Sequence, residues 1–528
     1  MDNLFINALV RAGLCKDHAP PSGQTSYLVS EASRNRQSHR GTLSSTTSTI
    51  RQYHGRSSCQ QDARAQLADS SRDDFLKLVD FYYEPSGPDI PLACTKVPTV
   101  LLKDPAATEA QEPPGPLILD NEAERRTLHC LAEALAPDTG SNDEIFKLYK
   151  ALPSPGVAYI PQHLIRLLLH RLSVVEKKNE SSMLRYLTIM DDMKASGIPL
   201  TLGEWNSAIS FTGRCFSKVS RVEVESALYL WKEMENDAGL KGNHVTFNIL
   251  FDVAVKAGKF VLAEMILKEM RARDIDSNRY GRVGLIFYYG YRGDGNGVRS
   301  AYKQLVEGGE IVDTAVLNCV IASLFRAGES PAAELVYERM KSLQASRMHK
   351  DLPPRDWRAR RSLGKQLQRA AIGVKKDHGS PQSIQENTAM APDLNTYRIL
   401  IKHHVHSTGN LESVTSLLDE MRHYEVSVDG SIFLLLLRGF CNQGGVRYTS
   451  WTASLLEEVW SACLDSVDKK ASQIYMGKFM AIWSLRAFAK CSGKARTLEV
   501  WDEINAKWHS PEADLKVVKG VLSSILGE

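Results

Sequence analysis

The middle of the chain carries short stretches in which apolar residues recur with the period of an amphipathic helix. One such stretch places five apolar residues on a single helical face, namely Phe247, Leu250, Phe251, Ala254 and Val255. Gly258 follows this stretch, and glycine is common just after the end of a helix. A second apolar face then begins, formed by Ala263, Ile266, Leu267 and Met270. The pattern predicts two helices joined by a tight turn.

This two-helix pattern recurs every 35 residues. Four sets of positions keep the register, namely Phe247, Arg282 and Leu317; Gly258, Gly293 and Gly328; Ala263, Val298 and Ala333; and Met270, Leu305 and Met340. One helical hairpin cannot bury its apolar face alone, so neighbouring units must stack on one another. The sequence therefore predicts an all-α fold, an α-solenoid of stacked helix-turn-helix repeats.

Weaker copies of the pattern extend the array on both sides, and one segment interrupts it. The expected divisions are a leader at 1–65, a linker at 66–119, degenerate helical repeats at 120–200, a repeat with an insertion at 201–243, repeats at 244–278, 279–313, 314–348 and 394–429, a basic insertion and linker at 349–391, degenerate helical repeats at 430–508 and a C-terminal helix at 509–528.

The residues of two units resemble the pentatricopeptide repeat. One unit reads HVTFNIL from His244, KAGK from Lys256 and LKEMRARDI from Leu267, and the other reads LNTYRILI from Leu394 and LLDEMR from Leu417. A tetratricopeptide repeat would have a 34-residue period and a Trp-x-x-Leu-Gly pattern, which the chain lacks. The resemblance covers about 200–348 and 394–429, and fungal mitochondrial members are the most similar in character. It implies a right-handed superhelix that binds single-stranded RNA, with one base per repeat.

In this family the fifth and last residues of each repeat read the base. The resemblance therefore pairs Asn206 with Asn243, Asn248 with Asn278, Val283 with Asp313, Asn318 with Met348, and Arg398 with Asp429. It assigns packing against the base to Val245, Tyr280, Ala315 and Asn395. Asparagine can donate to and accept from a base edge, whereas Val283 and Met348 are poor readers. An alternative stays open, in which each asparagine only satisfies backbone groups at a helix start.

A basic segment lies inside the array. Residues 347–376 hold ten Lys or Arg and two acids, a net charge of 10 − 2 = +8, and include Trp357. The whole chain has a net charge of only +3, so this segment dominates the positive surface. Cations beside an aromatic ring suit contacts with phosphates and bases. We expect Arg358, Arg360 and Arg361 to contact RNA; the alternative is a solvated helical insertion.

The first 65 residues differ in composition from the rest. Between residues 18 and 61 there are five arginines, many serines and one acid, Glu31. This composition is typical of a mitochondrial transit peptide, and the alternative is a disordered tail without a targeting signal. The nine cysteines form no CxxC motif, which argues against a zinc module or disulfide scaffold and fits a reducing compartment. We expect the protein in the mitochondrial matrix.

The sequence offers little for catalysis or membrane insertion. No apolar run approaches the roughly 18 residues of a membrane helix. The segment 293–297 is glycine-rich but lacks GxxxxGK[ST], so a hairpin turn is expected there. His403, His404 and His406 have no acid or cysteine nearby in sequence. We expect no cofactor, no metal site and no enzymatic activity.

Two functions remain. In the first, the protein binds single-stranded mitochondrial RNA and acts in transcript stability, processing or translation, with the mitochondrial ribosome as a further partner. In the second, the array is a protein scaffold or an assembly factor for a respiratory complex, because helical solenoids also bind proteins.

Overall fold

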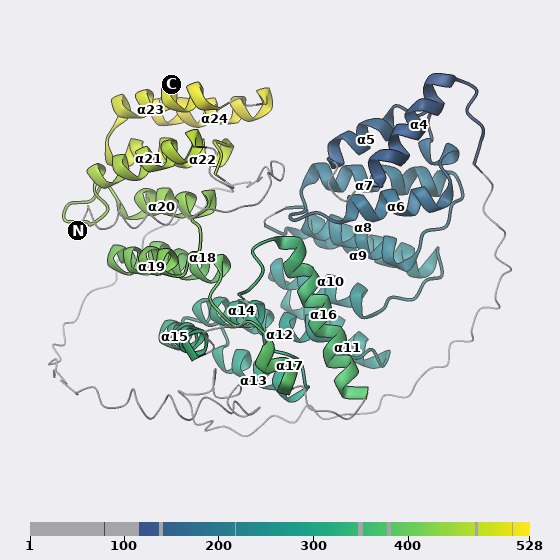
Figure 1. Cartoon of the computed structure of the whole chain (residues 1–528), viewed down its shortest axis with the longest axis horizontal. Coiled ribbons are helices and arrows are strands. Elements are labelled where there is room, and N and C mark those ends of the chain that lie inside the picture. The colour runs from purple at the N-terminus through teal and green to yellow at the C-terminus, as the bar shows by residue number, and fades with distance from the viewer. Residues whose placement is uncertain are drawn as a thin grey trace.

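A computed structural model describes residues 79, 116–136, 141–216, 218–346, 352–376, 382–469, 474–508 and 511–527 (Figure 1). Within these ranges every regular element is helical, which confirms the all-α class. The helices are α4 (Glu122–Leu135), α5 (Asn142–Lys150), η1 (Gly156–Tyr159), α6 (Gln162–Ser173), α7 (Glu180–Ala195), α8 (Leu202–Arg214), α9 (Arg221–Asn236), α10 (His244–Lys256), α11 (Phe260–Ala272), α12 (Arg279–Arg292), α13 (Gly295–Glu307), α14 (Thr314–Arg326), α15 (Ser330–Ser346), α16 (Trp357–Lys376), α17 (Gln382–Asn387), α18 (Leu394–His403), η2 (His404–Thr408), α19 (Leu411–His423), α20 (Gly430–Gln443), α21 (Ala453–Asp468), α22 (Lys478–Cys491), α23 (Lys494–Lys507) and α24 (Glu512–Leu526). The predicted leader and most of the predicted linker lie outside the described residues.

Consecutive helices pack in pairs, as the 35-residue pattern predicts. The pairs are α4 with α5, α6 with α7, α8 with α9, α10 with α11, α12 with α13, α14 with α15, α18 with α19, α20 with α21, and α22 with α23. Gly258 and Gly293 occupy the turns with φ angles of +68° and +75°, a backbone conformation that favours glycine because it lacks Cβ. The α-solenoid of helical hairpins is confirmed.

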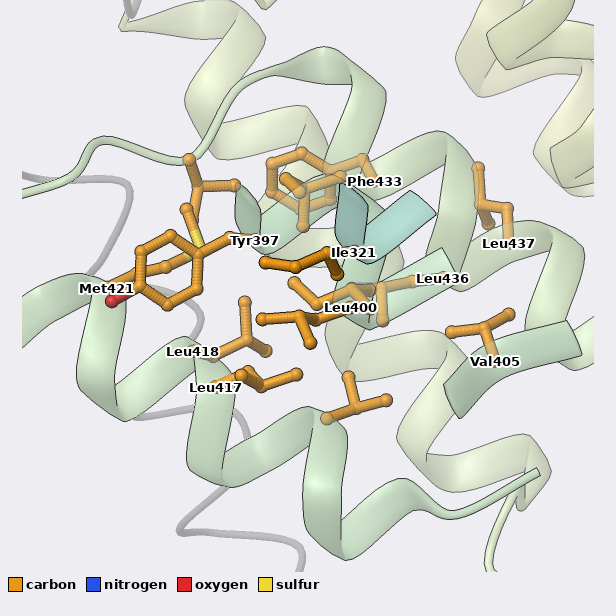
Figure 2. Packing of buried hydrophobic residues seen from close by; sticks show 14 of the residues in the cluster. Ile321, Tyr397, Leu400, Val405, Leu417, Leu418, Met421, Phe433, Leu436 and Leu437 are labelled. Atoms are coloured by element: carbon orange, nitrogen blue, oxygen red, sulfur yellow. The ribbon is translucent and has the colours of Figure 1, made fainter. Parts of the chain in front are cut away.

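The first helix of each pair contacts the first helix of the next pair from α6 through to α24. This row runs directly from α14 to α18, so α16 and α17 lie outside the stack. Figure 2 shows the continuity at this point: Ile321 of α14 lies among Tyr397 and Leu400 of α18, close to Leu436 of α20. The insertion is therefore added to the solenoid without interrupting its core.

Two repeats depart from 35 residues, and the structure shows where the extra residues go. In the repeat at 394–429, one extra residue is absorbed by a π-helical turn, η2, before Gly409. In the repeat at 201–243, the extra residues lengthen the turn at 215–220 and the helix α9. The pairing of helices is the same in both repeats.

The hydrophobic core is a strip that follows the stack. One cluster of buried residues extends from Leu119 to Tyr288, and a second from Ile286 to Leu522, so the two meet on α12. The pairs curve into an open arc, with α4–α9 in one arm and α18–α24 in the other (Figure 1). Among the described helices, none has the length and apolar character needed to span a bilayer.

Candidate nucleic-acid interface

The first helices from α8 to α20 each begin with a polar N-cap side chain. The caps are Thr201, Asn243, Asn278, Asp313, Asp393 and Asp429. Each side-chain oxygen accepts hydrogen bonds from backbone N–H groups of the first turn, which would otherwise lack partners. Asn243 and Asn278 therefore do satisfy backbone groups at a helix start, as the alternative expects, and Asp313 and Asp429 cap their helices in the same way.

A side chain from the preceding repeat reaches each cap from α10 onward. Asn206 Nδ2 donates to Asn243 Oδ1 over 3.4 Å, and Asn248 Nδ2 donates to Asn278 Oδ1 over 3.0 Å. In three of the pairs that the resemblance predicts, Asn206–Asn243, Asn248–Asn278 and Arg398–Asp429, the two residues are thus neighbours in space. The cap Asp313 is contacted by Arg279 instead of Val283. We call the whole series the cap row; its pairs are Asn206–Asn243, Asn248–Asn278, Arg279–Asp313, Asn318–Asp393 and Arg398–Asp429.

The predicted pairing of Asn318 with Met348 stays a prediction, because Met348 lies outside the described residues. Asn318 Nδ2 donates to Asp393 Oδ1 over 2.9 Å, because the insertion separates α14 and α15 from the next first helix, α18. Counting 35 residues along the sequence therefore does not reach Asp393. A sequence signal for Asp393 exists, since Asp393 and Thr396 are spaced as a capping box.

Two asparagines of the cap row are buried and already hydrogen-bonded. Asn206 is 6% exposed and Asn318 is 8% exposed. The hydroxyl of Thr246 donates to Asn206 Oδ1, and the hydroxyl of Thr396 donates to Asn318 Oδ1, each over 2.7 Å. A base would have to displace these bonds, so direct reading by Asn206 and Asn318 stays a prediction that the structure makes costly.

Two of the three acidic caps, Asp313 and Asp429, are neutralised by arginines. Arg279 pairs with Asp313 over 2.6 Å and also donates to the carbonyl of Ile311; Arg279 and Asp313 are 4% and 6% exposed. Arg398 pairs with Asp429 in the same way. Pairing removes the charge that would repel phosphates, but it also occupies the groups that would contact a base. Contacts of Asp313, Arg398 and Asp429 with RNA stay predictions.

The pair Asn248–Asn278 is the open one. Both residues are half-buried, and within the described part of the chain nothing bonds to Asn248 Oδ1 or Asn278 Nδ2. Gly281 makes this opening, because a Cβ there would lie 2.8 Å from Asn248 Oδ1. An acceptor and a donor therefore stand side by side, as a base edge requires. The predicted packing residues Val245 and Tyr280 belong to the same two helices and are 40% and 47% exposed.

The predicted basic residues lie on α16 and its surroundings. Arg358 and Arg361 are exposed and Arg360 is half-buried. Lys178, in the loop before α7, has its pKa lowered to about 8, first by burial and then by repulsion from Arg214 of α8 and Arg361. Positive charge from three separate elements therefore gathers near the start of α16, as the basic segment of the sequence suggested.

A cavity of about 130 Å³ lies where the start of α16 meets the repeat at 394–429. Its walls include Trp357 and Arg360 from the insertion, Arg398 and Asp429 from the cap row, and Tyr424. An aromatic ring beside two guanidinium groups suits a stacked base, whereas the carboxylates of Glu176, Asp356 and Asp393 in the same walls do not favour a phosphate. Sequence reasoning missed this cavity, since it joins segments that the chain order separates.

The glycine-rich segment 293–297 and His403, which the sequence considered for phosphate and metal binding, have structural roles. Gly293 ends α12 with a left-handed backbone and Asp294 caps α13, so the expected hairpin turn is confirmed. His403 stacks on Phe325 with ring centroids 4.0 Å apart, and burial lowers its pKa. Among the residues that the structure describes, no group of three or more His, Cys, Asp or Glu side chains is placed to hold a metal ion.

Comparison with known proteins agrees with the repeat pattern. The family profile described as PPR repeat matches residues 245–275 and 315–344. A search of curated proteins gave no match. Solved structures similar to this chain include the pentatricopeptide repeat protein PPR10 from maize and the same protein in complex with an 18-nt psaJ RNA element, each at 14% identity and a TM-score of 0.29. The alignments cover 76% of this chain and 59% and 53% of those chains, so this chain spans little more than half of their length.

Proposed function

We propose that this chain, a member of the pentatricopeptide-repeat family, is a mitochondrial single-stranded RNA-binding protein that acts in the stability, processing or translation of organellar transcripts. The observation that carries RNA binding is the open pair Asn248–Asn278. It offers an acceptor and a donor that have no partner within the described residues, next to two exposed apolar side chains. Such a site fits one unstacked base, held by its edge and packed on its face.

The mechanism is passive binding. Bases are held along the cap row, and the exposed cations of α16 attract the phosphates. The arginines that neutralise Asp313 and Asp429 favour this role, because free carboxylates at these two positions would repel the strand. A bound strand would then be shielded from enzymes that act on RNA, or presented to them.

The mitochondrial location rests on the composition of residues 1–65, which are rich in arginine and serine and poor in acids. Two fluorescent fusions test it, one of the full chain and one lacking residues 1–65. We expect the first to enter mitochondria and the second to remain outside. The same distribution for both fusions would contradict this location signal.

RNA binding is tested by crosslinking the tagged full chain in mitochondria and sequencing the attached RNA. We expect a defined footprint on an organellar transcript. The variant Asn278→Ala should weaken the footprint, whereas Asn410→Ala should not, because Asn410 caps the second helix α19 rather than a helix of the cap row. Recovery of assembly proteins or ribosomal proteins without RNA would replace this proposal with the scaffold function.

A further inference from the structure

The helix α16 has two opposite faces. Its apolar side consists of Leu363, Leu367, Ala370 and Ala371, which pack with Ile311 and Ile384. Its other side carries four exposed cations at spacings of three and four residues, which align along one face: Arg358, Arg361, Lys365 and Arg369. No carboxylate of the described chain pairs with any of these four. This row, which we call the basic stripe, is about 16 Å long at 1.5 Å per residue.

The helix α16 is anchored across the starts of α12 and α14. Ile311, two residues before the cap of α14, is completely buried by this contact. Gly364 permits close approach to α12, since a Cβ there would lie 3.3 Å from the Tyr280 hydroxyl. Gln385 of α17 then holds the backbone of Val312 with two hydrogen bonds of 2.6 and 2.7 Å. Figure 1 shows α16 drawn across α10 and α12.

The reading position beneath this helix is closed. In the repeat at 279–313 the fifth residue, Val283, cannot hydrogen-bond a base. The last residue, Asp313, is buried and bonded to Arg279 and to the backbone of Val316. On one side of this repeat the pair Asn248–Asn278 is open. On the other side the pair Asn318–Asp393 is also closed, and the cavity at Arg398 lies beyond it.

We infer that α16 is a bridge that carries the RNA backbone past the repeat at 279–313 by phosphate contacts alone. The protein would then read RNA in two base-specific blocks separated by a gap that accepts any base. The first block is the open pair Asn248–Asn278, and the second is the cavity lined by Trp357 and Arg398. The buried pair Asn318–Asp393 lies in the gap between them, together with Arg279–Asp313. This inference rests on the proposed function in RNA binding and adds the arrangement of its specificity.

Charge supports phosphate as the occupant of the basic stripe. The four cations are exposed and unpaired with described acids, and Lys178 with Arg214 adds positive charge beside Arg361. The apolar side of α16 also favours a bridge over a helix that leaves its place, since it shares a small buried cluster with Ile311. The following helix α17 is tied to the stack by the two hydrogen bonds between Gln385 and Val312.

The first test is selection of bound RNA from a randomised single-stranded pool with the full chain, followed by sequencing. We expect two short informative segments flanking positions without base preference. One uninterrupted informative run would overturn the bridge while leaving RNA binding intact. Complete absence of bound RNA would instead overturn the proposed function.

The second test neutralises the basic stripe with Arg358→Gln, Arg361→Gln, Lys365→Gln and Arg369→Gln. Each lost phosphate contact lowers the salt slope by about 0.7, so the slope of log affinity against log salt should fall by about 2.8 with unchanged base preference. The matched control changes four exposed cations on second helices, Lys232→Gln, Lys268→Gln, Arg271→Gln and Lys303→Gln, and should keep the slope. An unchanged slope in the stripe variant would overturn the bridge, and so would tighter binding, which would make α16 an inhibitor.

Discussion

Two pairs of the cap row share an asparagine at the fifth position but differ in whether that asparagine is free to contact a base. In both Asn248–Asn278 and Asn318–Asp393, the asparagine at the fifth position donates to the cap of the next first helix. Asn318 is buried and its oxygen accepts from Thr396, whereas the oxygen of Asn248 has no bond within the described chain because Gly281 stands where Thr396 stands. The third residue of the following helix therefore decides whether the pair can read a base.

The same comparison extends to the first pair. The hydroxyl of Thr246 donates a hydrogen bond to Asn206 Oδ1, just as the hydroxyl of Thr396 donates to Asn318 Oδ1. A threonine at this position favours stability, since it completes a buried hydrogen-bond network. A glycine there favours binding, since it leaves an acceptor open beside a donor. The open pair is the exception among the asparagine pairs of the cap row.

The closed pair Arg279–Asp313 should show the largest effect on stability. The variant Asp313→Ala leaves Arg279 buried without its partner, which costs about 3–5 kcal/mol. Hydrogen exchange of the α12 and α14 amides measures this loss. The control Asp294→Ala removes an N-cap without an ion pair and should cost about 1 kcal/mol. Equal losses in the two variants would mean that the ion pair adds nothing.

The next largest effect should be a difference in the loss of stability between variants of the two asparagine pairs. The variant Asn318→Ala removes two hydrogen bonds of a buried side chain, one donated to Asp393 and one accepted from Thr396, which costs about 1–3 kcal/mol. The matched variant Asn248→Ala should cost less than about 1 kcal/mol, because its site is half-buried and only one bond is lost. Hydrogen exchange of the α14 and α18 amides measures the loss of stability in Asn318→Ala. Exchange of the α10 and α12 amides measures the loss in Asn248→Ala. A larger loss at Asn248 would reverse the comparison.

The smallest expected effect concerns pH. Burial and repulsion from Arg214 and Arg361 lower the pKa of Lys178 to about 8, and Asp252 pairs with Arg214 over 2.7 Å. Lys178 is therefore charged below pH 8 and neutral above it, so RNA affinity should fall several-fold from pH 7 to pH 9 as one phosphate contact weakens. The variant Lys178→Gln should flatten this part of the profile. An identical decline in both proteins would remove Lys178 from the interface.

The repeats were predictable because their signals are local. Positions such as Gly258 and Met270 repeat at a fixed spacing, and their neighbours settle their roles. The partner of Asn318 was not predictable by counting, because the insertion places Asp393 in the position that Met348 would otherwise take. The position of α16 across α12 depends on Gly364 meeting Tyr280, a contact between segments far apart in the chain.

The sequence contains a signal for the role of the open pair, but the 35-residue period alone does not reveal it. Gly281 breaks the series that Thr246 and Thr396 form at the third residue of a first helix. Its effect comes from the absence of a hydroxyl that would bond to the preceding asparagine, and this becomes visible only when the two repeats are placed side by side.

The most direct measurement compares the base preferences of the wild type and Asn278→Asp on a randomised single-stranded RNA pool. Aspartate caps a helix as well as asparagine does, so stability should be kept. The donor beside Asn248 Oδ1 is lost, and one good base contact is worth about 1–3 kcal/mol. We predict a changed preference at one RNA position and the same preferences elsewhere. An unchanged profile, or a uniform loss of affinity without a change in preference, would contradict reading by this pair.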